Sequence, residues 1–168
     1  MQFEKVSLKT ASRKFVYYLD PDVHFYGEEE LERDMILPSR STYNAAGYDF
    51  FSPFNLRFEP GKSILIPTGV KCRLDTGYFL MIVPRSSVGI KKNLMLKNTI
   101  GIVDADYYNN PENEGMIYIA LYNYGNKTEE IKKYERFAQG IILPYATVTF
   151  ESFENVQERK GGIGSTGN

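Results

Sequence analysis

Residues 84–89, PRSSVG, carry side chains that are suited to binding phosphate. The planar guanidinium of Arg85 offers a fork of N–H donors, and Ser86, Ser87 and Gly89 continue the row of donors. Two lysines follow closely, at positions 91 and 92. The stretch therefore predicts an anion site, and an ordinary basic surface turn is the alternative.

Asp104 stands where a general base for water could act. It ends the apolar run 101–103, and Asp106 follows two residues later. If Asp104 ends a buried strand, nearby donors could keep it ionised to accept a proton from water. An acid without a function at such a place would cost roughly a few kcal/mol of desolvation. A pair of surface aspartates is the alternative. A metal held by the pair is a third reading, although Mg²⁺ takes many of its ligands from phosphates and water.

Further polar residues precede apolar stretches at two places. Asp49 closely follows Gly47, and Arg136 and Gln139 lie just before the apolar run 141–143. Arginine and glutamine side chains could donate hydrogen bonds to a polyphosphate. Each motif alone also fits a turn or the start of a strand, so these positions become informative only in combination.

The C-terminal residues 161–168, GGIGSTGN, formally match the G-x-G-x-x-G dinucleotide fingerprint. That fingerprint requires a strand before it and a helix after it, and a P-loop requires a lysine, so we expect neither site here. Glycines let backbone N–H groups approach an anion, and Ser165 and Thr166 add hydroxyl donors. Two interpretations stay open: a mobile arm that covers phosphates, or a disordered tail or expression remnant.

Short strands must hold these positions. Segments rich in Ile, Val, Tyr and Phe alternate with turn signals, which predicts an all-β barrel or sandwich. Glu28–Asp34 is the one segment predicted to be helical. Residues 17–34 are predicted to be an acidic, aromatic insertion, with a solvated surface loop as the alternative. The predicted strands are Phe3–Leu8, Leu56–Phe58, Lys62–Pro67, Val70–Leu74, Tyr78–Val83, Leu94–Asn98, Met116–Asn123 and Gln139–Tyr145.

Composition limits the partners and the chemistry. The 168 residues suit one domain, 1–150, followed by a flexible arm, 151–168. The 20 basic and 21 acidic residues nearly cancel, so we expect no binding to nucleic acid or to a membrane surface. One cysteine, Cys72, and one histidine, His24, cannot supply a usual zinc site or support a histidine–serine triad. We expect a cytoplasmic protein, because the sequence contains neither a membrane-spanning run nor a secretory signal.

Five stretches, taken in order, resemble the motifs of the trimeric dUTP pyrophosphatase (dUTPase) family over roughly residues 35–168. They are AAGYDF (45–50), PRSSVG (84–89), NTIGIVDADY (98–107), ERFAQ (135–139) and GGIGSTG (161–167). The resemblance implies a jelly-roll-like β barrel that forms homotrimers, with active sites at subunit interfaces that the C-terminal arm closes. It also implies hydrolysis of dUTP to dUMP and pyrophosphate with Mg²⁺.

The same resemblance implies a role for each matched residue. Asp104 would deprotonate the water that attacks the α-phosphorus, and Asp49 would support the hydration shell of Mg²⁺. Asn98 and the backbone of residues 99–103 would read the uracil edge, and Tyr107 would lie beneath the deoxyribose and leave no space for a 2′-hydroxyl. The phosphate-binding set would be Arg85, Ser86, Ser87, Gly89 and Gln139. The other substrate contacts would be Ile102 at the base and Arg159, Ile163, Gly164, Ser165 and Thr166 in the arm.

Several positions depart from the family pattern. Ile163 stands where the family usually has an aromatic ring, which removes about 1–3 kcal/mol of base stacking. Arg159 lies one residue closer to the glycines than usual. Tyr108 replaces a frequent arginine, residues 109–114 look like a small hairpin insertion, and residues 134–135 read YE in place of Gly-Asp.

Two rival functions stay open. The dCTP deaminases share this fold and a similar Arg-Ser-Ser turn, but their pattern has a catalytic glutamate where this chain has Ala120. A dUTPase-like regulatory or protein-binding module would use the insertions at 17–34 and 109–114 for partner contacts. Ammonia release from dCTP would identify a deaminase.

Overall fold

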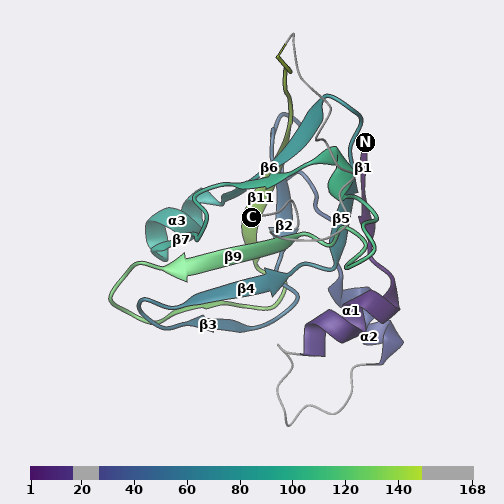
Figure 1. The fold of residues 1–168 in the computed structure, drawn as a ribbon. Helices are drawn as coiled ribbons and strands as arrows, with labels where there is room; N and C mark the ends of the chain where they lie inside the picture. Colours follow the sequence, from purple (N-terminus) through teal and green to yellow (C-terminus); the bar gives the residue numbers. More distant parts are fainter. Residues whose placement is uncertain (17–26, 149–168) are drawn as a thin grey trace.

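The computed structural model describes residues 1–16 and 27–148. These residues form mostly strands with few helices (Figure 1), which confirms the predicted all-β class. The helices are α1 (Leu8–Phe15), α2 (Glu28–Asp34) and α3 (Ser86–Lys91), and a 3₁₀ turn spans Ala105–Tyr107. The strands are β1 (Gln2–Lys5), β2 (Tyr48–Phe51), β3 (Leu56–Phe58), β4 (Ser63–Pro67), β5 (Val70–Arg73), β6 (Tyr78–Pro84), β7 (Leu94–Leu96), β8 (Gly101–Val103), β9 (Tyr118–Asn123), β10 (Glu129–Ile131) and β11 (Arg136–Pro144).

Every strand pair in the described ranges is antiparallel. The largest sheet has the order β2-β11-β6-β8, and β4-β9-β7 form a second sheet. β1 pairs with β5, and β3 pairs with β10. In Figure 1, β4 and β9 run along the lower half of the molecule, while β6 and β2 lie above and behind them. The largest sheet thus joins four segments that are far apart in the sequence.

Alternating side chains of these strands fill one shared core. In β9, Ile119 and Leu121 are buried, while Tyr118, Ala120 and Tyr122 are half-buried on the opposite face. Each fully buried side chain of this size stabilises the fold by roughly 1.5–3 kcal/mol relative to an exposed one. The largest fully buried side chains are Phe15, Phe50, Phe58, Phe137, Met35, Ile66, Leu80, Leu94, Leu96, Met116, Ile117 and Ile119.

The N-terminal segment differs from the prediction. Phe3–Leu8 is predicted as one strand, but β1 ends at Lys5 and α1 begins at Leu8. Ser7 caps α1, because its hydroxyl accepts a hydrogen bond from the backbone N–H of Thr10 over 3.2 Å. Ala11 and Phe15 follow Leu8 at helical spacing and are buried in the core.

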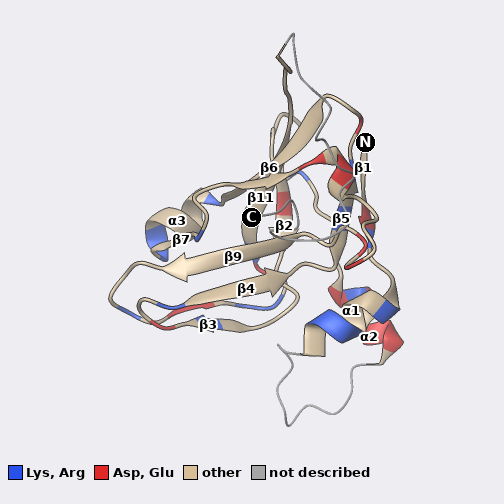
Figure 2. Ribbon diagram, viewed as in Figure 1, with Lys and Arg blue, Asp and Glu red and all other residues tan. Residues whose placement is uncertain are grey.

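The predicted helix Glu28–Asp34 is confirmed as α2. It lies beside α1, and Figure 2 shows basic residues on α1 and acidic residues on α2. The remainder of the predicted insertion, residues 17–26, lies outside the described residues, as does the predicted arm, 151–168. Within the described ranges, no helix is long and apolar enough to cross a membrane.

The predicted hairpin at 109–114 is instead a compact turn. The backbone N–H of Asn109 donates to the carbonyl of Glu114 over 3.1 Å, and the N–H of Glu114 donates to the carbonyl of Asn110 over 2.9 Å. Both Asn109 and Glu114 have positive φ angles, of 56° and 60°. These conformations reverse the chain without forming strands.

Candidate active site

Asp49 on β2 is the centre of a buried charged cluster. Nε of Arg85 lies 3.0 Å from Oδ1 of Asp49, and Nη1 of Arg136 lies 3.3 Å from Oδ2. The hydroxyl of Ser41 also donates to Oδ2. A buried carboxylate is costly unless it is paired and hydrogen-bonded, and these partners meet that requirement. The Asp49 side chain is 5% exposed and that of Arg85 is 27% exposed, so the guanidinium is held in place yet reachable by an anion.

Strand pairing brings three predicted site residues to one end of the largest sheet. Gln139 of β11 is paired with Asp49 of β2 on one side and with Val83 of β6 on the other. Arg85 follows directly after β6, and its N–H donates to the carbonyl of Phe137 over 3.3 Å. Asp49, Arg85 and Gln139 therefore lie together, although they are far apart in the sequence.

The predicted phosphate-binding turn is the beginning of α3 rather than an open turn. Arg85 is the residue before the first turn, and the N–H of Gly89 donates to its carbonyl over 3.0 Å. Val88 is buried and fixes this short helix, while Ser86 and Ser87 are exposed. Both serines are thus exposed, one and two residues after Arg85.

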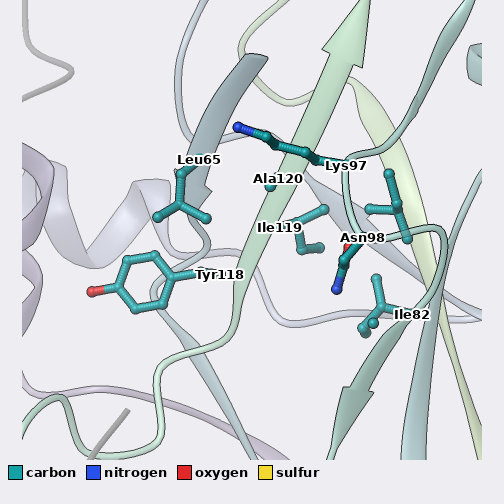
Figure 3. Close-up of a pocket in the computed structure, with 9 residues that line it drawn as sticks. Leu65, Ile82, Lys97, Asn98, Tyr118, Ile119 and Ala120 are labelled. Carbon is teal, nitrogen blue, oxygen red and sulfur yellow. The ribbon is translucent and has the colours of Figure 1, made fainter. Parts of the chain in front are cut away.

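A pocket of about 260 Å³ is lined by residues from both larger sheets. Asn98 comes from the connection between β7 and β8, Gly101 is the first residue of β8, and in Figure 3 the Asn98 side chain points towards Ile82. A Cβ at position 101 would lie 3.0 Å from Cβ of Ile82, so a glycine lets β8 approach β6 closely. The other lining residues are mainly apolar, among them Leu65 and Tyr118. An apolar pocket with one amide side chain can hold and orient a flat heterocycle.

Tyr107 and Ile102 lie on either side of Asp104 in the sequence and differ in exposure. Tyr107 is 7% exposed, and its hydroxyl donates to the carbonyl of Met116 over 2.9 Å. Ile102 is 50% exposed on β8, where it is paired with Met81. The ring of Tyr107 is thus buried and held through its hydroxyl, whereas Ile102 presents an apolar side chain to the outside of this chain.

Asp104 is not brought to the charged cluster within one chain. Leu80 of β6 is paired with Val103 of β8, so Asp104 lies level with the start of β6. Arg85 follows the other end of β6, about 20 Å away at the usual rise per strand residue. The sequence predicts a base at Asp104 if this residue ends a buried strand. Within one chain β8 is not buried at this end, because Ile102 and Asp104 are both exposed.

The remaining predicted site residues, Arg159, Ile163, Gly164, Ser165 and Thr166, lie outside the described residues, and so does His24. Cys72 is buried in the core, and burial raises the pKa of its thiol to about 12. Ser41 was not predicted. It lies eight residues before Asp49 in a polar stretch without periodicity, and only the folded chain brings the two side chains together.

Comparison with known proteins identifies the relatives of this chain. A family model described as dUTPase matches residues 33–167. A deoxyuridine 5′-triphosphate nucleotidohydrolase of Lactococcus lactis is 41% identical over 131 residues, which cover 78% of this chain and 87% of that protein. The crystal structure of a dUTPase from Streptococcus mutans superposes with a TM-score of 0.69 at 33% identity and covers 89% of this chain and 100% of that one.

A more distant structure shares the fold. A dUTPase from phage phi11 of S. aureus superposes with a TM-score of 0.61 at 24% identity and covers 73% of this chain and 92% of that one. That structure is described as revealing the coordination of a structural Mg(II) ion.

Proposed function

The chain belongs to the dUTPase family, and we propose that it hydrolyses dUTP to dUMP and pyrophosphate at a site shared between the subunits of a homotrimer. The observation that carries the proposal is the gathering of Arg85, Asp49 and Gln139 at one end of the largest sheet. Arg85 and Gln139, with the exposed hydroxyls of Ser86 and Ser87, form a donor surface that suits a triphosphate, and Asp49 holds the Arg85 guanidinium in place.

Asp104 supplies the base of the reaction. Its carboxylate takes a proton from a water molecule as the water oxygen bonds to the α-phosphorus. The bond from the α-phosphorus to the bridging oxygen breaks, and pyrophosphate leaves with the electron pair. The donors around Arg85 stabilise the negative charge on the phosphate oxygens during this step.

Mg²⁺ fits this site as an ion that enters with the substrate. Within the described residues, no three His, Cys, Asp or Glu side chains form a metal-binding group. Both carboxylate oxygens of Asp49 already form ion pairs with arginines, so Asp49 would reach the ion through water. Mg²⁺ on a nucleotide takes most of its ligands from phosphates and water, and when bound it would neutralise part of the phosphate charge.

The pocket at the β7–β8 connection receives the nucleoside. The amide of Asn98 pairs with the uracil edge together with the backbone near Ile102, and apolar lining residues exclude water from the base. The ring of Tyr107 lies beneath the deoxyribose and fills the space that a 2′-hydroxyl would need. The arm residues Arg159, Ile163, Gly164, Ser165 and Thr166 cover the bound nucleotide.

A second copy of this chain completes the site. Asp104 and Arg85 lie at opposite ends of β6, too far apart to act on one phosphorus atom. Leu65, Met95 and Ile102 are exposed apolar residues around the pocket and the neighbouring sheet face, and they suit a surface that is covered by another subunit. A ring of three copies would bring Asp104 of one subunit to Arg85 of the next.

The direct test is an assay of pyrophosphate release from dUTP, dTTP, dCTP and UTP, with and without Mg²⁺. We expect Mg²⁺-dependent cleavage of dUTP in preference to the other three nucleotides. Asp104→Asn should abolish turnover and leave dUTP binding intact, because the amide cannot take a proton from water. Asp106→Asn is the matched control and should retain turnover.

Rapid hydrolysis by Asp104→Asn would reject the assignment of the base. Ammonia release from dCTP would instead support the deaminase alternative. That alternative requires a catalytic glutamate at the position of Ala120, which lines the pocket. A protein partner and the cytoplasmic location stay predictions.

A further inference from the structure

Two buried asparagines hold Tyr107 at both of its ends. Nδ2 of Asn113 donates to the Tyr107 hydroxyl over 3.0 Å, and Nδ2 of Asn110 donates to the Tyr107 carbonyl over 2.9 Å. The asparagines are 3% and 4% exposed, respectively. Nδ2 of Asn110 also lies 2.8 Å from Oδ1 of Asn113, and that oxygen accepts the N–H of Gly115 over 2.9 Å. The two amides and the tyrosine thus form one hydrogen-bonded unit.

The turn at residues 109–114, which contains both asparagines, is hydrogen-bonded to the start of α1. The Glu114 carboxylate accepts the Ser7 N–H over 3.0 Å, the Ser7 hydroxyl over 2.5 Å and the Thr10 hydroxyl over 2.6 Å. Nη2 of Arg13 donates to the carbonyl of Glu112 over 3.1 Å. Asn113 lies between these anchors, so α1 supports its position from outside the nucleotide site.

We infer that Asn113 is a positioning residue that fixes the Tyr107 ring and thereby sets the selectivity for deoxyribose over ribose. The inference rests on the proposed function, in which that ring excludes a 2′-hydroxyl. Exclusion requires a side chain that cannot yield, because a shift of about 0.5 Å is enough to loosen a binding site. One bond to the Met116 carbonyl lets the hydroxyl pivot, and the second bond, from Asn113, removes that freedom.

The test compares kcat/KM for dUTP and UTP in Asn113→Ala and in a matched control, Asn123→Ala. Asn123 is also buried and also makes three side-chain hydrogen bonds, with Phe58, Lys127 and Gly125, but it lies at the far end of β9. We expect the preference for dUTP to fall about tenfold in Asn113→Ala, through faster cleavage of UTP, and to stay unchanged in Asn123→Ala.

Tyr107→Phe supplies a second measurement, because it keeps the ring and removes the hydroxyl that Asn113 binds. It should show a similar loss of preference, and the double variant Asn113→Ala/Tyr107→Phe should lose no more than either single variant. If Asn113→Ala is too unstable to assay, Tyr107→Phe carries the test. The inference would be overturned if the wild-type protein prefers dUTP over UTP and this preference is unchanged in Asn113→Ala or Tyr107→Phe. A wild-type protein that does not cleave dUTP would overturn the proposed function instead.

Discussion

Gly47 and Gln139 show how closely the residues around Asp49 are packed. A Cβ at position 47 would lie 2.4 Å from Oε1 of Gln139 and 3.2 Å from its Cβ. The first distance is well inside van der Waals contact, so only a glycine leaves the glutamine side chain in its present position. Gly47, in the stretch 45–50, therefore leaves room for the side chain of Gln139, in the stretch 135–139.

Gly47→Ala should displace the Gln139 side chain and weaken phosphate binding. We expect kcat/KM for dUTP to fall about tenfold or more, since a hydrogen bond to a charged group contributes about 1.5–3 kcal/mol. Gly27→Ala is the control, because no atom of the described residues lies within 4 Å of a Cβ added there. Steady-state kinetics and urea midpoints of both variants separate lost binding from lost stability. Equal activity of the two variants would contradict a role for Gln139.

At the scale of elements, β1, α1 and α2 explain positions that depart from the family pattern. The Tyr108 hydroxyl donates to Glu4 over 2.6 Å, and the Tyr134 hydroxyl donates to Asp34 over 2.5 Å. Glu114 accepts hydrogen bonds from residues at the start of α1. These three departures from the family pattern thus share one structural cause, which is attachment of the N-terminal elements to the sheets.

Glu114 should make this attachment sensitive to acid. Partial burial raises the pKa of Glu114, but hydrogen bonds from Ser7 and Thr10 and the charge of Lys71 outweigh it and lower the pKa to about 2. A carboxylate whose pKa is lower in the folded protein stabilises it at neutral pH. That contribution is lost as the pH falls from about 4.5 towards about 2.

Glu114→Gln should lower the free energy of unfolding by about 1 kcal/mol at neutral pH, as expected for a weakened helix cap. Its stability should then decline less steeply than that of the wild type below about pH 4.5. Urea unfolding measured at intervals from neutral to acidic pH provides the comparison. Glu59→Gln, at an exposed turn, should keep the wild-type slope, and a wild-type slope in Glu114→Gln would show that this carboxylate does not stabilise the fold.

The sequence was most informative where the pattern was local. The predicted segments overlap β1, β3, β4, β5, β6, β7, β9 and β11, because apolar alternation and turn residues mark each of them. The short helix α1 was missed because Leu8 continues the pattern of β1, although Leu8, Ala11 and Phe15 have helical spacing. Ser41 and Asn113 could not be identified, since nothing in their neighbours in the sequence reveals contacts that only the folded chain creates.

At the scale of the whole molecule, the order of the five motifs along the sequence does not reveal which of them lie close together within one chain. Asp49, Arg85 and Gln139 gather at one end of the largest sheet. Asp104 lies at the opposite end of β6. Motif spacing could not predict this division, because it follows from strand register. In the proposed function this division makes an oligomer part of the chemistry, and the division can be tested without an oligomer structure.

Complementation between two inactive variants is that test. Asp104→Asn and Arg85→Ala should each be inactive as homotrimers, but a mixed trimer contains one site with an intact Asp104 from one subunit and an intact Arg85 from its neighbour. Random mixing should therefore restore about one quarter of wild-type activity. Pyrophosphate release after co-expression and after simple mixing of the folded proteins measures the recovery. Asp104→Asn mixed with the double variant Asp104→Asn/Arg85→Ala should stay inactive. If both residues served one site within a single chain, no combination would recover activity.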